Sequence, residues 1–257
     1  MEHFAAFDLE TTGTDTKTAR PVEVGIYLSD GPFTASMRCN PGAVIFSESA
    51  EEASAIHGIK ADDLKDAPPV EEAVAWALRK IGDLPLLTYN GAAFDLKITP
   101  EIGKGRPVID VFRLVQLLQA DHPIPELGSF GHPLGLSAFS LRLEVVYGAV
   151  TGRVLEGAHN AGRDAQATAE VFNCLRCLYP TLLGRPLGEL AEALEEPPST
   201  WSDWSRICEY KHGHWRMGVG KHKGMRLDRV PRDYIRWMLR EDFDPSTKDL
   251  VRGFLDR

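Results

Sequence analysis

The sequence has little cysteine, and it lacks the long apolar segments and leader features of secreted or membrane proteins. Four cysteines occur among its 257 residues, at positions 39, 174, 177 and 208. Because Cys174 and Cys177 lie within an apolar helical pattern, we interpret these thiols as buried or partly buried in a reducing compartment, not as a redox motif or zinc site. No apolar run approaches the ~20 residues that span a bilayer. Residues 1–7 show no signal-peptide pattern, so we expect a cytoplasmic protein with no membrane partner.

An excess of basic residues is also missing, since the net charge is −8. The charge is unevenly distributed, however. Residues 206–240 contain ten Lys and Arg but three acids, a net charge of +7 that leaves −15 on the remaining chain. A basic segment beside an acidic body is typical of proteins that bind a polyanion, although a solvated basic face would give the same pattern.

The order of apolar patterns predicts an α/β fold. Short alternating or apolar segments predict strands at residues 3–9, 21–28, 33–39, 85–89 and 108–109. Helical spacing of apolar residues predicts helices at residues 70–81, 111–119, 137–147 and 161–178. Three strands in an antiparallel meander, followed by strands alternating with helices, indicate a mixed sheet covered by helices.

The chain divides into three parts in this interpretation. Residues 1–180 form the α/β domain, and residues 181–205, which contain several glutamates and a Pro-Pro-Ser-Thr stretch, form a linker. Residues 206–257 form a small basic C-terminal domain. Tyr234 and Trp237 are spaced with Met238 as core residues of that domain, although exposed aromatic residues there would offer surfaces on which nucleic-acid bases stack.

Two carboxylates on the first predicted strand are the first chemical signal. Asp8 and Glu10 are two residues apart, so both side chains point to one face of an otherwise apolar strand. Their mutual repulsion and desolvation are unfavourable, and a divalent cation would remove that penalty. A metal site is therefore expected at the end of this strand.

Further acids stand at the start of two predicted helices. Asp95 lies five residues after Asn90, which follows a buried strand, and by itself it could simply stabilise a helix N-terminus. His159 precedes the predicted helix at 161–178, and Asp164 lies about one turn inside it. Each motif is weak alone, and their order along the chain gives them weight.

Together these motifs resemble the DEDDh family of 3′→5′ exonucleases, which includes proofreading subunits of DNA polymerases. Residues 8–13, Asp-Leu-Glu-Thr-Thr-Gly, match the first family motif, and residues 55–59, Ala-Ile-His-Gly-Ile, match a second segment. The resemblance implies a ribonuclease H-like mixed five-stranded sheet flanked by helices. It also implies two Mg²⁺ ions per site, with Mn²⁺ as a substitute, and a nucleic-acid substrate with a 3′ end.

The resemblance further assigns roles to the motif residues. Asp8 would bridge two metal ions, Glu10 and Asp164 would complete the site that holds the attacking water, and Asp95 would serve the second ion through water. His159 would be the general base, since an imidazole accepts protons near neutral pH. The residues expected to contact substrate are Leu9, Thr11, Thr12, His57, Asn90 and Phe94.

The tail favours a DNA substrate over RNA. Residues 218–224 and 230–239 resemble a module that follows the nuclease domain in exonucleases of the bacterial exonuclease X type. An exoribonuclease, a polymerase proofreading subunit and a homodimer stay open. A non-catalytic binding module would require the loss of a carboxylate or of the histidine, and all five are present. A zinc site from Cys208, His212, His214 and His222 has irregular spacing and is disfavoured.

Overall fold

The computed structural model divides the chain into two compact units, each described here by itself. The residues that the structure describes are 2–120, 141–194, 208–211, 214–218, 221–241 and 245–255. The first unit contains residues 2–120 and 141–194, and the second contains the described residues from 208 onward. Among the described helices, none combines the length and the apolar character needed to cross a bilayer.

The first unit is built on a five-stranded mixed sheet, which confirms the predicted fold class. Its strands are β1 (Ala5–Thr11), β2 (Pro21–Leu28), β3 (Phe33–Arg38), β4 (Leu86–Thr88) and β5 (Val108–Asp110). Their order is β3-β2-β1-β4-β5. β1, β2 and β3 form the expected antiparallel meander, and β4 and β5 run parallel to β1. β1 is therefore the central strand, and the residues that follow β1 and β4 lie at the same end of the sheet.

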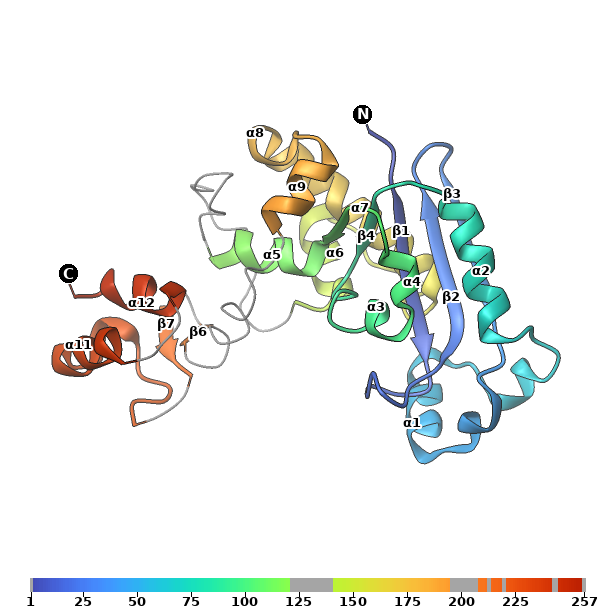
Figure 1. Cartoon of the computed structure of the whole chain (residues 1–257), viewed down its shortest axis with the longest axis horizontal. Coiled ribbons are helices and arrows are strands. Elements are labelled where there is room, and N and C mark those ends of the chain that lie inside the picture. Colours follow the sequence, from blue (N-terminus) through green and yellow to red (C-terminus); the bar gives the residue numbers. More distant parts are fainter. Residues whose placement is uncertain are drawn as a thin grey trace. The chain divides into compact units, whose positions relative to one another are not determined.

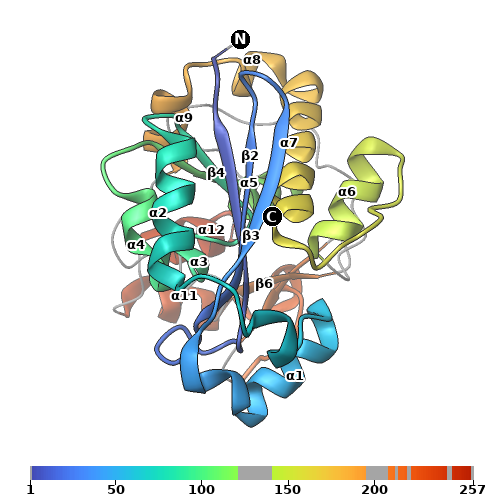
Figure 2. The same cartoon turned by 90° about the vertical axis from the view of Figure 1, so that its right-hand side faces the viewer.

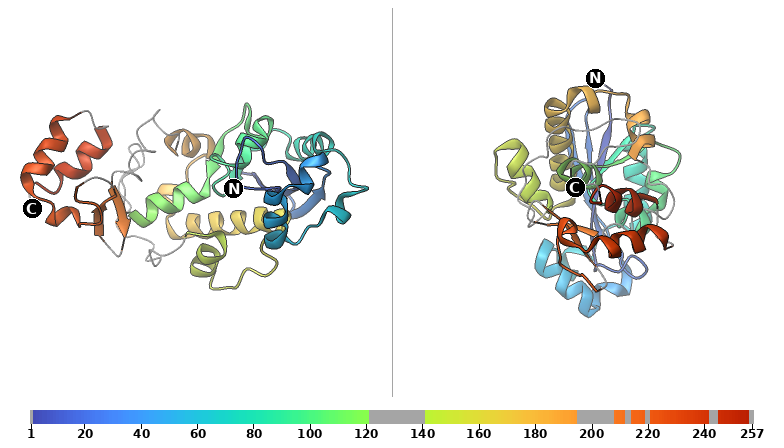
Figure 3. Two further views of the ribbon diagram at one scale, coloured as in Figure 1. Left: turned by 90° about the horizontal axis from the view of Figure 1, so that it is seen from below. Right: turned by 90° about the vertical axis from the view of Figure 1, so that its left-hand side faces the viewer.

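Helices cover both faces of this sheet (Figures 2 and 3), with α2 (Val70–Ile81) on one face and α7 (Ala161–Leu178) on the other. Both helices have the bounds predicted from their apolar spacing. Because side chains alternate along β1, Phe7 and its neighbours Ala5 and Leu9 join the core under α2. Phe4, with the opposite parity, packs edge-on against Phe172 of α7 at 5.8 Å.

The remaining elements of the first unit are shorter. They are η1 (Gly42–Phe46), α1 (Glu48–His57), η2 (Ala61–Leu64), α3 (Asp95–Ile98), α4 (Pro100–Gly103), α5 (Val111–Ala120), α6 (Leu143–Thr151), α8 (Pro180–Leu183) and α9 (Leu187–Leu194). The helix expected at residues 137–147 begins at Leu143, because Arg142 is extended and is the N-cap residue. Residues 137–140 lie outside the described part of the chain.

The expected linker at residues 181–205 begins later than the composition suggested. Residues 187–194 form α9, whose Leu187, Leu190 and Ala191 are buried and which packs near β5 in the first unit. The glutamates that suggested a linker, such as Glu189 and Glu192, lie on the exposed side of this helix. Residues 195–207 are outside the described part of the chain.

The cysteines are free thiols, as expected, although one is more exposed than predicted. Cys39 and Cys208 are buried and Cys174 is half-buried. Cys177 is exposed, because it lies on the side of α7 that faces away from the buried Leu175.

The second unit, whose strands and helices are coloured orange to red in Figure 1, has its own small core. Its elements are the antiparallel strands β6 (Cys208–Lys211) and β7 (His214–Met217), then η3 (Leu227–Arg229), α11 (Arg232–Arg240) and α12 (Pro245–Arg252). Cys208, Ile235, Met238 and Val251 are buried in this core. The predicted core role holds for Tyr234, which is partly buried against it, whereas Trp237 is 38% exposed.

Candidate active site

β1 presents Asp8 and Glu10 on the sheet face that α7 covers. Leu9, between them, is buried on the opposite face, in the core under α2. Both acids are half-buried and neither is open to bulk water. The strand therefore holds two carboxylates side by side in a place with little solvent to screen them.

The start of α7 brings His159 and Asp164 to the same place. Asn160 caps the helix, since its side chain accepts a hydrogen bond from the backbone N–H of Arg163 at 3.0 Å. The backbone N–H of His159 donates to Oδ2 of Asp164 at 2.9 Å. His159 has a left-handed backbone with φ of 64°, a strained conformation that this turn fixes.

A glycine on β2 allows α7 to lie this close to the sheet. A Cβ atom on Gly25 would be 2.0 Å from the carbonyl carbon of Ala161 and 2.3 Å from the backbone nitrogen of Gly162, so any side chain would displace the helix. Gly25 is paired with Asp8 across the two strands. The contact between backbones therefore occurs directly beside the carboxylates of β1.

Glu23 fastens the helix start to β2, and the sequence analysis did not identify it. The Glu23 carboxylate is buried, and its Oε2 accepts hydrogen bonds from Nδ2 of Asn160 and the backbone N–H of Ala161, both at 2.9 Å. Its Oε1 accepts one from the hydroxyl of Ser36 at 3.0 Å. Glu23 is also paired with Glu10 across the strands. It positions α7 and adds negative charge to the site.

The fourth acid reaches the site from the segment after β4. Asp95 is the first residue of α3, it is buried, and its Oδ1 accepts the backbone N–H of Leu9 at 3.1 Å. The preceding turn is held by Asp110, which accepts the backbone N–H groups of Asn90 at 2.8 Å and Ala92 at 3.1 Å. Asp95 is thus tied to the catalytic strand rather than serving merely as a helix cap. We call Asp8, Glu10, Asp95 and Asp164 the carboxylate site.

The carboxylate site is electrostatically strained without a cation. Burial, followed by the charges of Asp95 and Asp164, raises the pKa of Asp8 well above its ordinary value. Burial and then the charge of Asp164 raise the pKa of Glu10 to about 8. Burial also raises the pKa of Asp95 to about 7 and that of Asp164 to about 6. Four buried acids that each raise the cost of ionising the others form a site that a divalent cation would stabilise.

The donor set fits a metal ion that prefers oxygen. Glu10, His159 and Asp164 each offer a ligand atom, and these atoms lie within 4.8 Å of one another. Oδ1 of Asp164 is buried and has no hydrogen-bond partner among the described residues. A buried oxygen of this kind is normally satisfied, so it is suited to coordinate an ion.

The two histidines differ in exposure. His159 is exposed at the edge of the site, where a substrate can reach its imidazole. His57, at the end of α1, is half-buried, and its Nδ1 accepts the backbone N–H of Ile59 at 3.0 Å. Burial is the main cause of the lowered pKa of His57, and the charge of His159 acts in the same direction.

The residues predicted to contact substrate differ from one another in burial and in their local hydrogen bonds. The hydroxyl of Thr11 donates to the carbonyl of Gly13 at 2.8 Å, and that of Thr12 accepts the backbone N–H of Arg20 at 3.0 Å, so both side chains are buried in the turn after β1. Asn90, with φ of 62°, and the half-buried Phe94 lie on the segment that leads to Asp95. The roles of Leu9, Thr11, Thr12, His57, Asn90 and Phe94 in substrate binding stay predictions.

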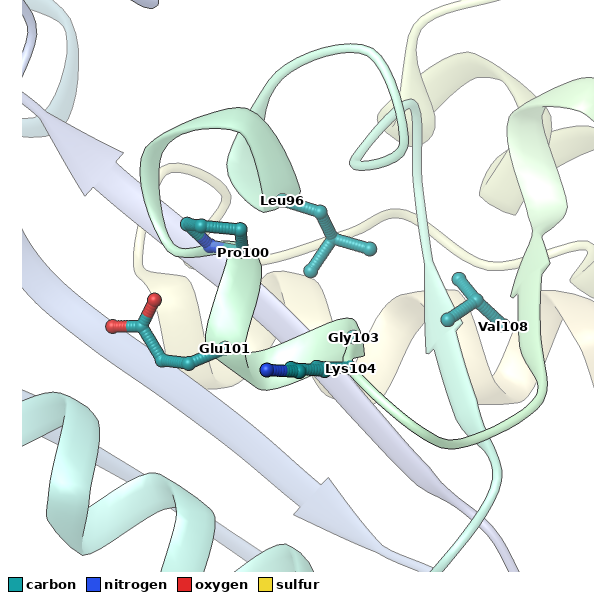
Figure 4. A pocket seen from close by; sticks show the side chains of 6 residues that line it. All are labelled: Leu96, Pro100, Glu101, Gly103, Lys104 and Val108. Atoms are coloured by element: carbon teal, nitrogen blue, oxygen red, sulfur yellow. The ribbon is translucent and has the colours of Figure 1, made fainter.

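A shallow hollow elsewhere in the first unit contains none of these residues. It lies beside α4 and β5 and is lined by Leu96, Pro100, Glu101, Gly103, Lys104 and Val108 (Figure 4). Its lining is mainly aliphatic and carries one acid and one base. The chemistry of the first unit is therefore expected at the carboxylate site instead.

The zinc alternative gains no support from the described residues. His212 lies outside the described part of the chain, whereas His222 packs edge-on against Tyr234 at 4.5 Å. The metal-ligating cluster found among the described residues is the one at Glu10, His159 and Asp164.

The chain is similar in sequence and in structure to known exonucleases and to a DNA polymerase. Residues 5–105 match the RNase T family of exonucleases. Over 180 residues the chain is 28% identical to a PolC-type DNA polymerase III of Clostridium perfringens. The matched region covers 66% of this chain and 11% of the polymerase. Escherichia coli exonuclease I in complex with a dA16 oligonucleotide matches with a TM-score of 0.55 at 20% identity, over 72% of this chain and 42% of that one. Exonuclease I of Methylocaldum szegediense matches with a TM-score of 0.54 at 23% identity, over 72% and 42%.

Residues 5–105, the part of the chain that matches the exonuclease family, include Asp8, Glu10 and Asp95. The structural matches establish the same fold. The chain spans about a tenth of the polymerase and less than half of each exonuclease I chain.

Proposed function

We propose that the first unit is a metal-dependent 3′→5′ exonuclease that releases nucleoside 5′-monophosphates from the end of a DNA strand. The observation that carries the proposal is the carboxylate site, whose four acids all have raised pKa values. One of their oxygens, Oδ1 of Asp164, is buried and has no hydrogen-bond partner among the described residues. A purely structural cluster of this kind would destabilise the fold. Nucleases that use two metal ions hold them with such a cluster.

The four carboxylates would hold two Mg²⁺ ions, which Mn²⁺ could replace. When bound, divalent cations supply positive charge to the attacking and leaving oxygens of the phosphodiester. Asp8 lies on the central strand, and the charges of Asp95, Asp164 and Glu10 all act on it, so its carboxylate would be one of the groups that hold the ions. The held positions of Asp95 and Asp164 keep the ligand geometry fixed before substrate arrives.

His159 would accept the proton of the attacking water. The new P–O bond forms to that water, and the bond to the 3′ oxygen of the preceding nucleotide breaks. The backbone of His159 is fixed by its hydrogen bond to Asp164 while its imidazole stays exposed, so the ring is available to a water at the substrate's terminal phosphate.

DNA is the proposed substrate because of three likenesses. The polymerase relative acts in DNA synthesis by its name, and the matched exonuclease I structure holds a deoxyadenylate oligonucleotide. The resemblance of the tail to the exonuclease X module points the same way. The catalytic residues alone do not separate DNA from RNA, since the 2′-hydroxyl is what distinguishes them.

A digest of matched DNA and RNA oligonucleotides, labelled at the 5′ end, tests the proposal. With Mg²⁺ we expect a ladder of products shortened from the 3′ end of the DNA, and with EDTA no products. Asp164→Asn should remove the activity, whereas Asp83→Asn, the same change at an exposed position, should keep it. Cleavage that persists in EDTA would refute the metal-dependent mechanism, and cleavage of RNA alone would make the protein an exoribonuclease.

A further inference from the structure

The second unit exposes a row of arginines along one side of α11. Arg232, Arg236 and Arg240 are all exposed and are spaced four residues apart, whereas Ile235 and Met238 face the core. Side chains four residues apart lie on the same face of a helix, about 6 Å apart along its axis. The three guanidinium groups therefore form a line along the outer face of α11.

These arginines are not neutralised by neighbouring acids. Arg232, Arg236 and Arg240 form no ion pair with any residue that the structure describes, in contrast to Arg226, which binds Asp228 through two bonds of 2.9 and 2.6 Å. The acid of α11, Asp233, is exposed in the first helical turn, where the helix dipole favours a negative charge. The row thus presents three guanidinium groups that have no ion pair among the described residues, with the exposed Asp233 and Glu241 beside it.

An aromatic group lies beside the row. The ring of Tyr234 contacts His222 at 4.5 Å and Trp237 at 5.0 Å between centroids, and Trp237 is 38% exposed. His222 belongs to a turn whose Lys221 and Lys223 are both exposed. Contact with Tyr234 thus holds this turn and its two cations against α11, while part of the Trp237 indole remains open to solvent.

We propose that this α11 face, made of Arg232, Arg236, Arg240 and Trp237, binds single-stranded nucleic acid. Guanidinium groups bind phosphates through paired hydrogen bonds, and an exposed indole stacks on a base of any sequence. A partner protein with acidic side chains would be bound by the arginines alone. The indole beside them fits a nucleic-acid strand better, because a strand carries both phosphates and bases. The inference rests on the proposed function, since the strand bound here would be the strand that the first unit shortens.

The negative charge of the rest of the chain explains why a cationic binding face would help to capture a strand. Apart from residues 206–240 the chain has a net charge of −15, which repels a polyanion. Metal ions at the carboxylate site act only on the terminal phosphates. A cationic surface elsewhere would offset the repulsion by displacing counterions from the strand.

The test is binding of the full chain to a fluorescent oligodeoxythymidylate in EDTA, followed by anisotropy at several salt concentrations. Arg232→Gln, Arg236→Gln and Arg240→Gln together should reduce the slope of log affinity against log salt by about 2, since each lost phosphate contact removes ~0.7. The matched control is Arg79→Gln, Lys104→Gln and Arg185→Gln, which removes three exposed cations of the first unit. It should leave the slope unchanged.

Changes at Trp237 separate stacking from charge. Trp237→Leu should weaken binding roughly 5- to 100-fold with no change in salt slope, because stacking releases no counterions. Trp237→Phe keeps a ring and should restore most of the affinity, which a loss of folding would not allow. An unchanged slope in the arginine variant, or an equal loss in the control variant, would overturn the inference.

Hydrolysis distinguishes this inference from the proposed function. A dinucleotide has one phosphodiester, which the carboxylate site itself would hold, so the arginine variant should hydrolyse it at the wild-type rate in Mg²⁺. If the wild type hydrolyses DNA but the arginine variant binds strands normally, the inference fails and the proposed function stands. If the wild type binds strands through this face but hydrolyses nothing, the proposed function fails instead.

Discussion

Glu23 provides a sharp test of how the site is assembled, because it acts on catalysis without contacting substrate in our account. Its carboxylate binds the start of α7 through Asn160 and Ala161, which lie in the chain between His159 and Asp164 of the site. Glu23→Ala should therefore lower both stability and turnover. Glu23→Gln keeps an oxygen for these two donors and should lower both far less.

The magnitudes follow from the individual bonds. In Glu23→Ala the backbone N–H of Ala161, which is fully buried, loses its acceptor, and an unpaired buried donor costs about 1–3 kcal/mol. The donors on Asn160 and Ser36 are on exposed residues and can turn to water, so we expect a total loss of about 2–4 kcal/mol. A shift of α7 by ~1 Å would lower the turnover number by roughly 100-fold.

Denaturant unfolding and single-turnover hydrolysis measure the two effects. The matched control is Glu71→Ala, which removes an exposed glutamate paired with Arg20 at 3.3 Å and should cost less than about 1 kcal/mol. Glu23→Gln should also move metal binding to lower pH, since the charge of Glu23 is one cause of the raised pKa values of Asp8 and Glu10. A Glu23→Ala protein with wild-type stability and turnover would refute the positioning role.

The other predictions concern the ligands, the base, the helix contact and pH. Asp164→Ala should abolish hydrolysis with an intact fold; near wild-type turnover would contradict its role as a ligand. His159→Ala should lower the turnover number by roughly 10²–10⁴ while calorimetry finds metal affinity retained; lost affinity would make His159 a ligand. Gly25→Ala should displace α7 and lower melting temperature and activity together, and unchanged values would argue against the close backbone contact. Because the folded pKa of Glu10 is raised from 4.5 to about 8, the metal-free protein should lose stability as pH rises through that window and regain it with Mg²⁺, measured by melting at each pH; a metal-free melting temperature that rises over this window would contradict the raised pKa.

The elements with strong periodicity could be predicted from the sequence. Residues 70–81 and 161–178 bury one helical face against the sheet, so their apolar spacing gave their bounds. α1 was not predicted, because just one of its residues, Ala50, is buried and its sequence carries little periodicity. α9 was interpreted as linker because its glutamates masked the spacing of Leu187, Leu190 and Ala191.

Site residues could be predicted from the sequence where a charged residue interrupts an otherwise apolar strand and belongs to a recognised motif. Asp8 and Glu10 met that condition, and the structure brings Asp164 and Asp95 close enough for their charges to act on them. Glu23 carried a similar signal, a carboxylate between two valines on a predicted strand, but its partners at the start of α7 lie more than a hundred residues away. Gly25 carried no signal, because a close approach between two backbones depends on tertiary packing.

The position of bound metal tests the central claim most directly. The measurement is anomalous X-ray scattering from crystals of the full chain grown with Mn²⁺ and a deoxynucleoside 5′-monophosphate. We predict two manganese peaks at the carboxylate site, both within ligand distance of Asp8, with Oδ1 of Asp164 bound to one of them. Manganese bound elsewhere, with no peak beside Asp8 and Asp164, would contradict the account.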